Sequence, residues 1–363
     1  MSVSLRDIAE RAGVSTAAVS QALRGIGRIS PATRERIRAI ARELDYHPDP
    51  LISRAFSRVR QPEARAYRET IAFILEWELP RYLEGIFHAA SERASALGYR
   101  LDPFVVSGRP SEHRRMSQIL RTRGIRGLII AQRLGSPQPR LYFDWQHFTA
   151  VELGGTLRYP RTLHRVQSAG YQTFPEAIHL LKRVGYRRIG MAIEPAQNRH
   201  QNGVYYAAYL LYQLRRPRRE RIPIFAPTGP WNETTFRRWI TRYQPDVLLV
   251  HRFELIREWL ERMGLRVPED ISLFGVNAPH AAASGLRRDV VEIAHSAVDM
   301  VSIGLSNGEF GIPRHPRIVL IDELWQAGKS LSRPIDSFIS PDGCLERMQP
   351  ASQRARPGIV PRF

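Results

Sequence analysis

The sequence predicts two parts, an N-terminal all-α unit and a larger two-lobed α/β domain with parallel sheets. Apolar residues recur with a helical period over residues 1–46, and short apolar runs alternate with amphipathic helical stretches from Thr70 onward. The alternating region reaches residue 332, which is too long for a single small sheet, so we expect two lobes.

Composition excludes several classes of protein. The 363 residues are 43% hydrophobic, which is ordinary for a globular chain, and no apolar run is long enough to span a bilayer. The N-terminus lacks the apolar region of a signal peptide, so we expect a cytoplasmic protein. Cys344 is the single cysteine, which excludes an internal disulfide and a CxxC metal site. We expect neither a metal nor another cofactor.

The net charge of +19 permits nucleic-acid binding but does not locate it. Only two of the 54 basic residues are lysine, Lys182 and Lys329, and such a bias reflects genome composition as much as function. The positive charge is also spread over the whole chain. The evidence for a DNA-binding site must therefore come from local patterns.

The first two helices are predicted by apolar spacing and by capping residues. Leu5, Ile8, Ala9 and Ala12 form one apolar stripe, and Gly13 permits a tight turn. Ser15 is placed to cap a second helix, in which Val19 and Leu23 face inward. Val14 and Val19 are spaced as a hydrophobic staple. A third helix begins at Ser30 and Pro31, and its inner stripe comprises Ile37, Ile40, Ala41 and Leu44.

The second helix presents small, polar or basic side chains on its other face, namely Thr16, Ala17, Ser20, Gln21 and Arg24. A short helix with such an N-terminal end fits the major groove of DNA. The Gln21 amide matches the donor and acceptor of an adenine edge, and serines with a helix N-terminus suit phosphates. The alternative interpretation is a helical hairpin used for dimerisation or packing.

The α/β region follows a connector at residues 47–69, which is proline-bounded and arginine-rich. Strands are predicted at 70–75, 127–131, 187–193, 246–250 and 270–276, with helical stretches between them. Gly98, Gly185 and Gly264 each follow a helical stretch and are predicted to end it. Residues 333–363 are proline-rich without clear periodicity, and we expect an irregular C-terminal extension.

The N-terminal segment "LRDIAERAGVSTAAVSQALRG...ISPATRERIRAIARELDYHP" closely resembles the headpiece of the lactose- and galactose-repressor family of bacterial transcriptional regulators. The later segments "LLKRVGYRRIGMAI" and "QPDVLLVH...RMGLRVPEDISLFGVN" resemble the same family. The resemblance implies a helix-turn-helix headpiece and a two-lobed, periplasmic-binding-protein-like domain. It also implies a homodimer that binds double-stranded operator DNA, with a small-molecule effector, expected to be a carbohydrate, in the cleft between the lobes.

The resemblance also implies residue roles. Thr16, Ala17 and Gln21 match base-reading positions, whereas Ser15 and Ser20 match phosphate contacts, and we add Arg24 to the phosphate-contacting set. The family's hinge helix places a leucine in the minor groove, but Ala55 stands at that position, so Leu51 and Phe56 become the other candidates. A plain linker is the alternative.

In the cleft, Arg199 and Trp231 match positions that bind ligands in relatives, by a bidentate guanidinium and a stacked ring. The other candidates stand where the family's polar residues are replaced: His251, Arg252, Asn277 and His295. The alternative is that Trp231 packs on the start of its helix and Arg199 is solvated.

The function predicted is a ligand-controlled, sequence-specific transcriptional regulator, which we expect to be a repressor. Three alternatives remain: a constitutive DNA-binding regulator that has lost effector control, a solute-binding protein of the same fold, and an enzyme on an α/β scaffold. The sequence has no G-x-S-x-G elbow, P-loop or HExxH motif, so we do not expect an enzyme.

Overall fold

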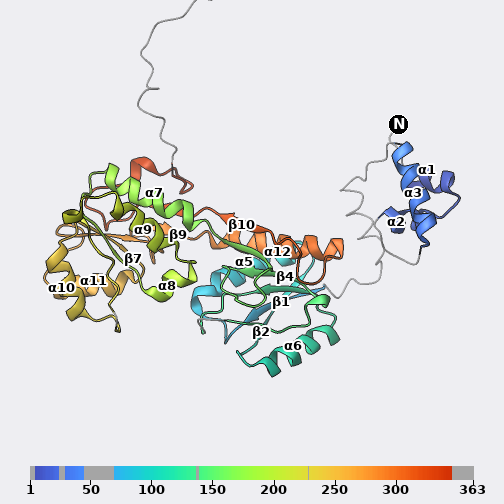
Figure 1. Cartoon of the computed structure of the whole chain (residues 1–363), viewed down its shortest axis with the longest axis horizontal. Coiled ribbons are helices and arrows are strands. Elements are labelled where there is room, and N and C mark those ends of the chain that lie inside the picture. Colours follow the sequence, from blue (N-terminus) through green and yellow to red (C-terminus); the bar gives the residue numbers. More distant parts are fainter. Residues whose placement is uncertain (1–4, 24–28, 45–68, 136–138, 228, 346–363) are drawn as a thin grey trace, which may run out of the picture. The chain divides into compact units, whose positions relative to one another are not determined.

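The computed structural model describes residues 5–23, 29–44, 69–135, 139–227 and 229–345. The chain separates into two compact units, Met1–Tyr67 and Arg68–Phe363 (Figure 1). Most of the expected connector lies outside the described residues, and so do four candidate site residues, namely Arg24, Leu51, Ala55 and Phe56. Within the described parts of the chain, no helix is long and apolar enough to cross a membrane.

The N-terminal unit consists of three short helices, α1 (Leu5–Ala12), α2 (Thr16–Leu23) and α3 (Pro31–Glu43). Their shared core contains the expected apolar stripes, and its fully buried members are Ile8, Val19, Ala22 and Ile37. Gly13 has a φ of 62°, in the left-handed region that a glycine adopts without steric cost, and it makes the turn between α1 and α2. The predicted helices and their inner faces are therefore confirmed.

The first lobe of the large unit is built on a six-stranded sheet in which every pairing is parallel. The strand order is β10-β5-β4-β3-β1-β2, with bounds Ile318–Ile321, His164–Ser168, Thr149–Leu153, Gly127–Ile130, Thr70–Leu75 and Arg100–Val105. Helices α5 (Arg81–Ala96) and α12 (Val290–Asn307) pack against each other on one face of this sheet.

The other face of the first sheet is covered only in part by a helix. One helix, α6 (Pro110–Thr122), shares this face with an irregular segment, residues 139–148, that contains the short 3-10 helix Trp145–His147. Leu141, Phe143 and Phe148 in this segment are buried against the sheet. Apolar side chains on an irregular backbone thus replace the helix that a β-α-β unit would place between β3 and β4.

The second lobe has a five-stranded sheet of order β11-β9-β8-β7-β6. The strands β6 (Ile189–Ala192), β7 (Val247–Val250), β8 (Ser272–Gly275) and β9 (Gly285–Arg287) are parallel, whereas β11 (Leu324–Gln326) joins the edge antiparallel. Both faces carry helices: α7 (Gly170–Arg183) and α9 (Val204–Leu214) on one, α10 (Glu233–Tyr243) and α11 (Phe253–Arg262) on the other. The short helix α8 (Pro195–His200) follows β6, and a 3-10 helix, Arg218–Glu220, follows α9.

Three crossovers connect the lobes. The chain leaves the first lobe between β5 and α7 at Ala169, returns between β9 and α12 at Arg288 and Asp289, and leaves again between β10 and β11 at Asp322 and Glu323. In both lobes the carboxyl ends of the parallel strands lie at the side of the sheet where these crossovers begin. A ligand in an open α/β sheet binds beyond the carboxyl ends of the strands, so the fold places the candidate cleft between the lobes.

The predicted helix ends are confirmed by backbone conformation. Gly98, Gly185 and Gly264 have φ values of 88°, 104° and 77°, directly after the C-caps of α5, α7 and α11. These are left-handed values, which explains why glycine stands at all three positions.

Residues 333–345 pack against the second lobe. Ile335 is 1% exposed within the core that also contains α7 and α9, and Phe338 closes the 3-10 helix Asp336–Phe338 beside it. Ile339 then forms an isolated bridge with Leu345. The packed core therefore continues beyond the boundary that composition placed at residue 333.

Candidate nucleic-acid interface and ligand cleft

The outward face of α2 is defined by what the helix buries. Val19 and Ala22 are fully buried against α1 and α3, and Leu23 packs beside them. Gln21 is half-buried, and Thr16 at the N-terminal end of α2 is exposed. The side chains of Ala17 and Ser20 lie outside the described part of the structure.

Ser15 caps α2 as predicted. Its Oγ accepts a hydrogen bond from the backbone N–H of Ala18 at 3.2 Å, and Ser15 itself is exposed. The remaining N–H groups of the first helical turn have no intrahelical acceptor, and with the helix dipole they favour an anion such as a DNA phosphate. Ser30 caps α3 in the same way, because its Oγ accepts from the N–H of Thr33 at 3.1 Å.

One structural residue of the headpiece was missed from the sequence. Arg36 in α3 donates from Nη2 to the carbonyl oxygen of Ala12, at the end of α1, at 2.8 Å. This bond satisfies an unpaired carbonyl at the C-terminus of α1 and holds α3 beside the turn that precedes α2. Arg36 is an exposed residue directly before the buried Ile37, and no pattern in the sequence indicated its contact with α1.

In the second lobe, the ends of β6 and β7 bring several candidates together. His251 and Arg252 follow β7, and Arg252 donates from Nη1 to the Glu194 carboxylate, which follows β6, at 3.2 Å. Burial lowers the pKa of His251, and its Nδ1 is buried without a hydrogen-bond partner. Asn277, two residues after β8, is exposed.

Arg199 and His200 lie in the last turn of α8, at the same end of the second sheet. Arg199 is exposed, and His200 is half-buried. The pKa of His200 is lowered mainly by burial and further by the positive charges of Arg199 and Arg158. Since Arg158 belongs to the loop after β4, this electrostatic interaction places α8 close to the first lobe.

Trp231 does not stand free in the cleft. Its half-buried ring packs against Phe225 at 5.0 Å and Trp259 at 6.5 Å between centroids, at the edge of the core of the second lobe. The alternative interpretation placed the ring on the start of its own helix, whereas these neighbours come from the segment before α10 and from α11. The Trp231 Nε1 is buried without a hydrogen-bond partner.

His295 lies within α12, which follows the second crossover. The neighbouring Ala294 is fully buried under α12, and His295 is half-buried on the flank of that helix. The third crossover carries Asp322 and Glu323.

A small pocket at the junction of the lobes contains residues that the sequence analysis missed. Its polar lining comprises Gln132, Gln167, Ser168, Gln201 and Arg288. Gln132 follows β3, Ser168 ends β5, Gln201 follows α8, and Arg288 occupies the second crossover. Polar residues directly after predicted strands and helices were the available signal, but only the tertiary structure shows that they meet.

Two buried carboxyl groups flank this region. Burial raises the pKa of Glu323, in the third crossover, to about 7, and Thr173 and Arg288 only partly offset this effect. Burial also raises the pKa of Glu152, at the end of β4, to about 7, although its Oε1 accepts from the N–H of Leu157 at 2.6 Å. These carboxyls therefore carry a reduced negative charge near neutral pH.

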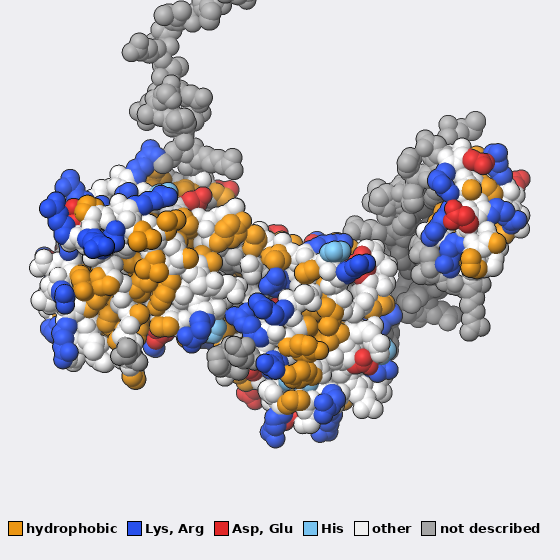
Figure 2. Space-filling model, viewed as in Figure 1, with side chains coloured by type: hydrophobic (Ala, Val, Ile, Leu, Met, Phe, Trp, Pro, Cys, Tyr) orange, Lys and Arg blue, Asp and Glu red, His pale blue; other side chains and the backbone are white. Residues whose placement is uncertain are grey.

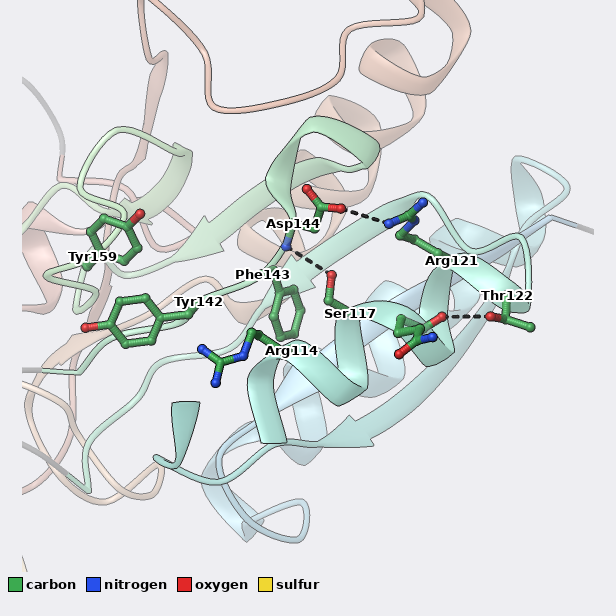
Figure 3. Close-up of a pocket in the computed structure, with 9 residues that line it drawn as sticks. Arg114, Ser117, Arg121, Thr122, Tyr142, Phe143, Asp144 and Tyr159 are labelled. Carbon is green, nitrogen blue, oxygen red and sulfur yellow. Dashed lines mark hydrogen bonds and ion pairs between the residues drawn. The ribbon is translucent and has the colours of Figure 1, made fainter. Parts of the chain in front are cut away.

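A larger surface pocket of about 790 Å³ lies elsewhere, on the face of the first lobe that α6 covers (Figure 3). Arg114, Ser117 and Arg121 from α6 face the segment Tyr142–Asp144 across it, and Arg121 forms an ion pair with Asp144 at 2.8 Å. The groove is therefore lined by α6 on one side and by the irregular segment between β3 and β4 on the other.

Comparison with known proteins agrees with this architecture. Residues 4–49 match the family described as bacterial regulatory proteins, lacI family, and residues 178–322 match the periplasmic binding protein-like domain. A helix-turn-helix headpiece joined to such a two-lobed domain defines a transcriptional regulator with a ligand-binding domain. The second match extends from α7 to β10, and the first gives the chain the headpiece of the lacI family. This is a family of regulators and not of enzymes.

Individual relatives are more distant. The HTH-type transcriptional regulator MalR of Streptococcus pneumoniae serotype 4 is 28% identical over 140 residues, which are 36% of this chain and 38% of MalR. The matched part therefore spans less than half the length of that curated relative. A lac repressor dimer bound to operator and the anti-inducer ONPF has a TM-score of 0.53 at 20% identity, covering 92% of this chain and all of the repressor chain. The CelR–cellobiose complex has a TM-score of 0.54 at 19% identity, covering 90% of this chain and 99% of CelR. The predicted fold class is thus confirmed.

Proposed function

We propose that the chain is a cytoplasmic, sequence-specific repressor that binds operator DNA as a homodimer. The observation that carries this proposal is the outward face of α2, which is held over an intact three-helix core with Thr16 and Gln21 available to bases. The cap at Ser15 leaves the N-terminal amides of α2 free to position a phosphate. Two such headpieces on a dimer would read half-sites about one helical turn apart.

We also propose that a small ligand in the interlobe cleft controls DNA binding. The crossovers at Ala169, Arg288 and Glu323 are the only covalent links between the lobes in the described chain, so a ligand that contacts both lobes can change their relative position. The small pocket at this junction is lined by amide and hydroxyl groups, which are of the kind that bind the hydroxyl groups of a sugar or sugar derivative. CelR, a similar structure, is described in complex with cellobiose, which supports this ligand class.

A constitutive regulator without effector control is the second candidate. The packing of Trp231 against the core of the second lobe favours it, because Phe225 and Trp259 already contact part of the ring that would stack on a sugar. A solute-binding protein is disfavoured by the capped and packed headpiece.

To test sequence-specific DNA binding, the purified full-length protein is used to select the duplexes that it binds from a random pool at moderate salt. We expect an enriched near-palindrome whose binding weakens with added salt. Gln21→Ala should relax preference at one base pair in each half-site, whereas Ser20→Ala should weaken binding to all duplexes alike. Binding that depends on salt but not on sequence would overturn the proposed function.

A further inference from the structure

Positive side chains reach the junction of the lobes from three separate parts of the fold. Arg158 belongs to the first lobe, Arg199 and His200 lie on α8 of the second lobe, and Arg288 occupies the second crossover and lines the pocket there. Figure 2 shows basic side chains, drawn in blue, on both sides of the notch between the lobes. Within the described residues, the guanidinium groups of Arg158, Arg199 and Arg288 make no hydrogen bond or ion pair.

The carboxylates of the same region do not neutralise these cations. Glu194 is engaged by Arg252 at 3.2 Å. Glu76 accepts from the N–H of Gly135 at 2.8 Å and lies 3.8 Å from the fully buried Arg133. Glu152 and Glu323 are almost fully buried, and Asp289 accepts from the N–H of Glu292 at the start of α12 at 3.0 Å. Asp322, in the third crossover, is exposed. Within the described residues, no ion pair joins any of these carboxyls to Arg158, Arg199 or Arg288.

Further donors at the junction have unused hydrogen-bonding capacity. The Nδ1 of His251 and the Nε of Arg165 are both buried without a partner. Arg165 belongs to β5, and its Nη1 approaches the backbone at Gly155, in the loop that also contributes Arg158. Buried donors without acceptors destabilise a protein unless a ligand or water satisfies them.

We propose that the effector carries a phosphate or carboxylate group, which Arg158, Arg199 and Arg288 bind together across the junction of the lobes. This inference rests on the proposed control by a ligand in the cleft. The neighbouring amides of Gln167 and Gln201 and the hydroxyl of Ser168 would bind the hydroxyl groups of the same ligand. The class of effector is thus a sugar phosphate or a sugar acid.

The same charges explain how such a ligand acts on the fold. Arg158 of the first lobe and Arg199 of the second repel each other across the junction. An anion between them replaces this repulsion with two charge-assisted contacts, and it therefore favours the closed arrangement of the lobes.

The experiment uses full-length protein and pairs of ligands that differ only in charge. Glucose 6-phosphate and gluconate are compared with glucose, and galactose 6-phosphate and galactonate with galactose, while inorganic phosphate serves as the bare anion. Binding is measured by calorimetry and by the thermal midpoint. We expect at least one charged sugar to bind about tenfold or more tightly than its neutral partner. The phosphate and acid arms identify which anionic group the site accepts.

Two arginine variants test the site itself. Arg288→Gln should weaken the charged ligand about tenfold or more, whereas Arg238→Gln on the exposed surface of α10 makes the same charge change and should leave its affinity unaltered. Equal affinity for a charged sugar and its neutral partner would overturn the proposal, as would binding of none of these ligands. Operator binding without ligand is measured in parallel, so that failure of this proposal is distinguished from failure of the proposed regulator.

Discussion

The Arg36 guanidinium and the Ala12 carbonyl are joined by a 2.8 Å hydrogen bond that links α3 to the end of α1. The bond lies beside Gly13, where the chain turns into α2. It therefore supports the turn that sets the direction of the proposed reading helix.

Arg36→Ala should lower the stability of the headpiece by about 1 kcal/mol, because one hydrogen bond that also satisfies a helix end is lost. Hydrogen exchange of the α1 and α3 amides in the full-length protein measures the change. Arg38→Ala, also exposed on α3, is the matched control and should leave exchange unaltered. Equal acceleration in both variants would show that charge, and not this bond, stabilises the headpiece.

Ser15 has two proposed roles that substitution can separate. Ser15→Ala should destabilise α2 by about 1 kcal/mol through loss of the cap, and Ser30→Ala should destabilise α3 by a similar amount. Ser15→Asp retains a capping acceptor but places a negative charge near the expected phosphate. It should therefore keep the stability of the headpiece and weaken binding to all DNA sequences. Unchanged DNA affinity in Ser15→Asp would contradict the phosphate contact.

Glu323 makes the large unit sensitive to pH. Its pKa is raised from 4.5 to about 7 in the folded protein, so folding favours the protonated carboxyl. The protonated Glu323 carboxyl therefore stabilises the fold fully below pH 4.5, and this stabilisation is lost as pH rises through 7. Relative to Glu323→Gln, the wild-type protein should lose about 2.5 kcal/mol of unfolding free energy between pH 5 and 8. Denaturant unfolding of both proteins between pH 5 and 8 measures this difference in unfolding free energy. The prediction is refuted if the unfolding free energies of the two proteins change with pH in parallel.

Binding of an anionic ligand should take up protons at His200. Burial and the charges of Arg199 and Arg158 lower the pKa of this histidine in the empty cleft, and a bound anion opposes the effect of both arginines. The pKa of His200 should therefore rise on binding, and affinity should increase as pH falls from 7 toward 5.5.

A carboxylate ligand is the appropriate probe, because phosphate itself titrates near pH 6. Calorimetry with the tightest sugar acid of the panel measures the pH dependence. His200→Gln should bind with a flatter pH profile, whereas His147→Gln, on the 3-10 helix of the first lobe, should retain the wild-type profile. Identical profiles in all three proteins would exclude His200 as the group that takes up the proton.

Most of the fold could be predicted because its signals are local. Ser15 and Ser30 cap helices through their own turns, and Gly98, Gly185 and Gly264 end helices by their own φ angles. The irregular segment between β3 and β4 was not predicted as the cover of a sheet face. Its buried side chains, Leu141, Phe143 and Phe148, have no regular period, so no pattern in the sequence shows which surface they cover.

The cleft could be predicted only in outline. Resemblance pointed to Arg199, His251 and Arg252, and the structure places them near one another at the ends of β6 and β7 and in α8. It did not point to Arg288 or Gln201. Whether a side chain enters a site between lobes depends on how crossovers and helices far apart in the chain come together. Trp231 was expected in the cleft, but its ring packs against Trp259 and the core of the second lobe.

The sequence by itself determined the three-helix headpiece, the face that α2 turns outward, and the alternation that builds two parallel-stranded lobes. Capping, helix period and glycine conformation act within a few residues, so they can be read along the chain. Only the tertiary structure decided that Arg158, Arg199 and Arg288 lie around one junction and that, in the described chain, no ion pair joins them to a nearby carboxyl. Charge interactions depend on distance and burial, and neither quantity is contained in the order of residues.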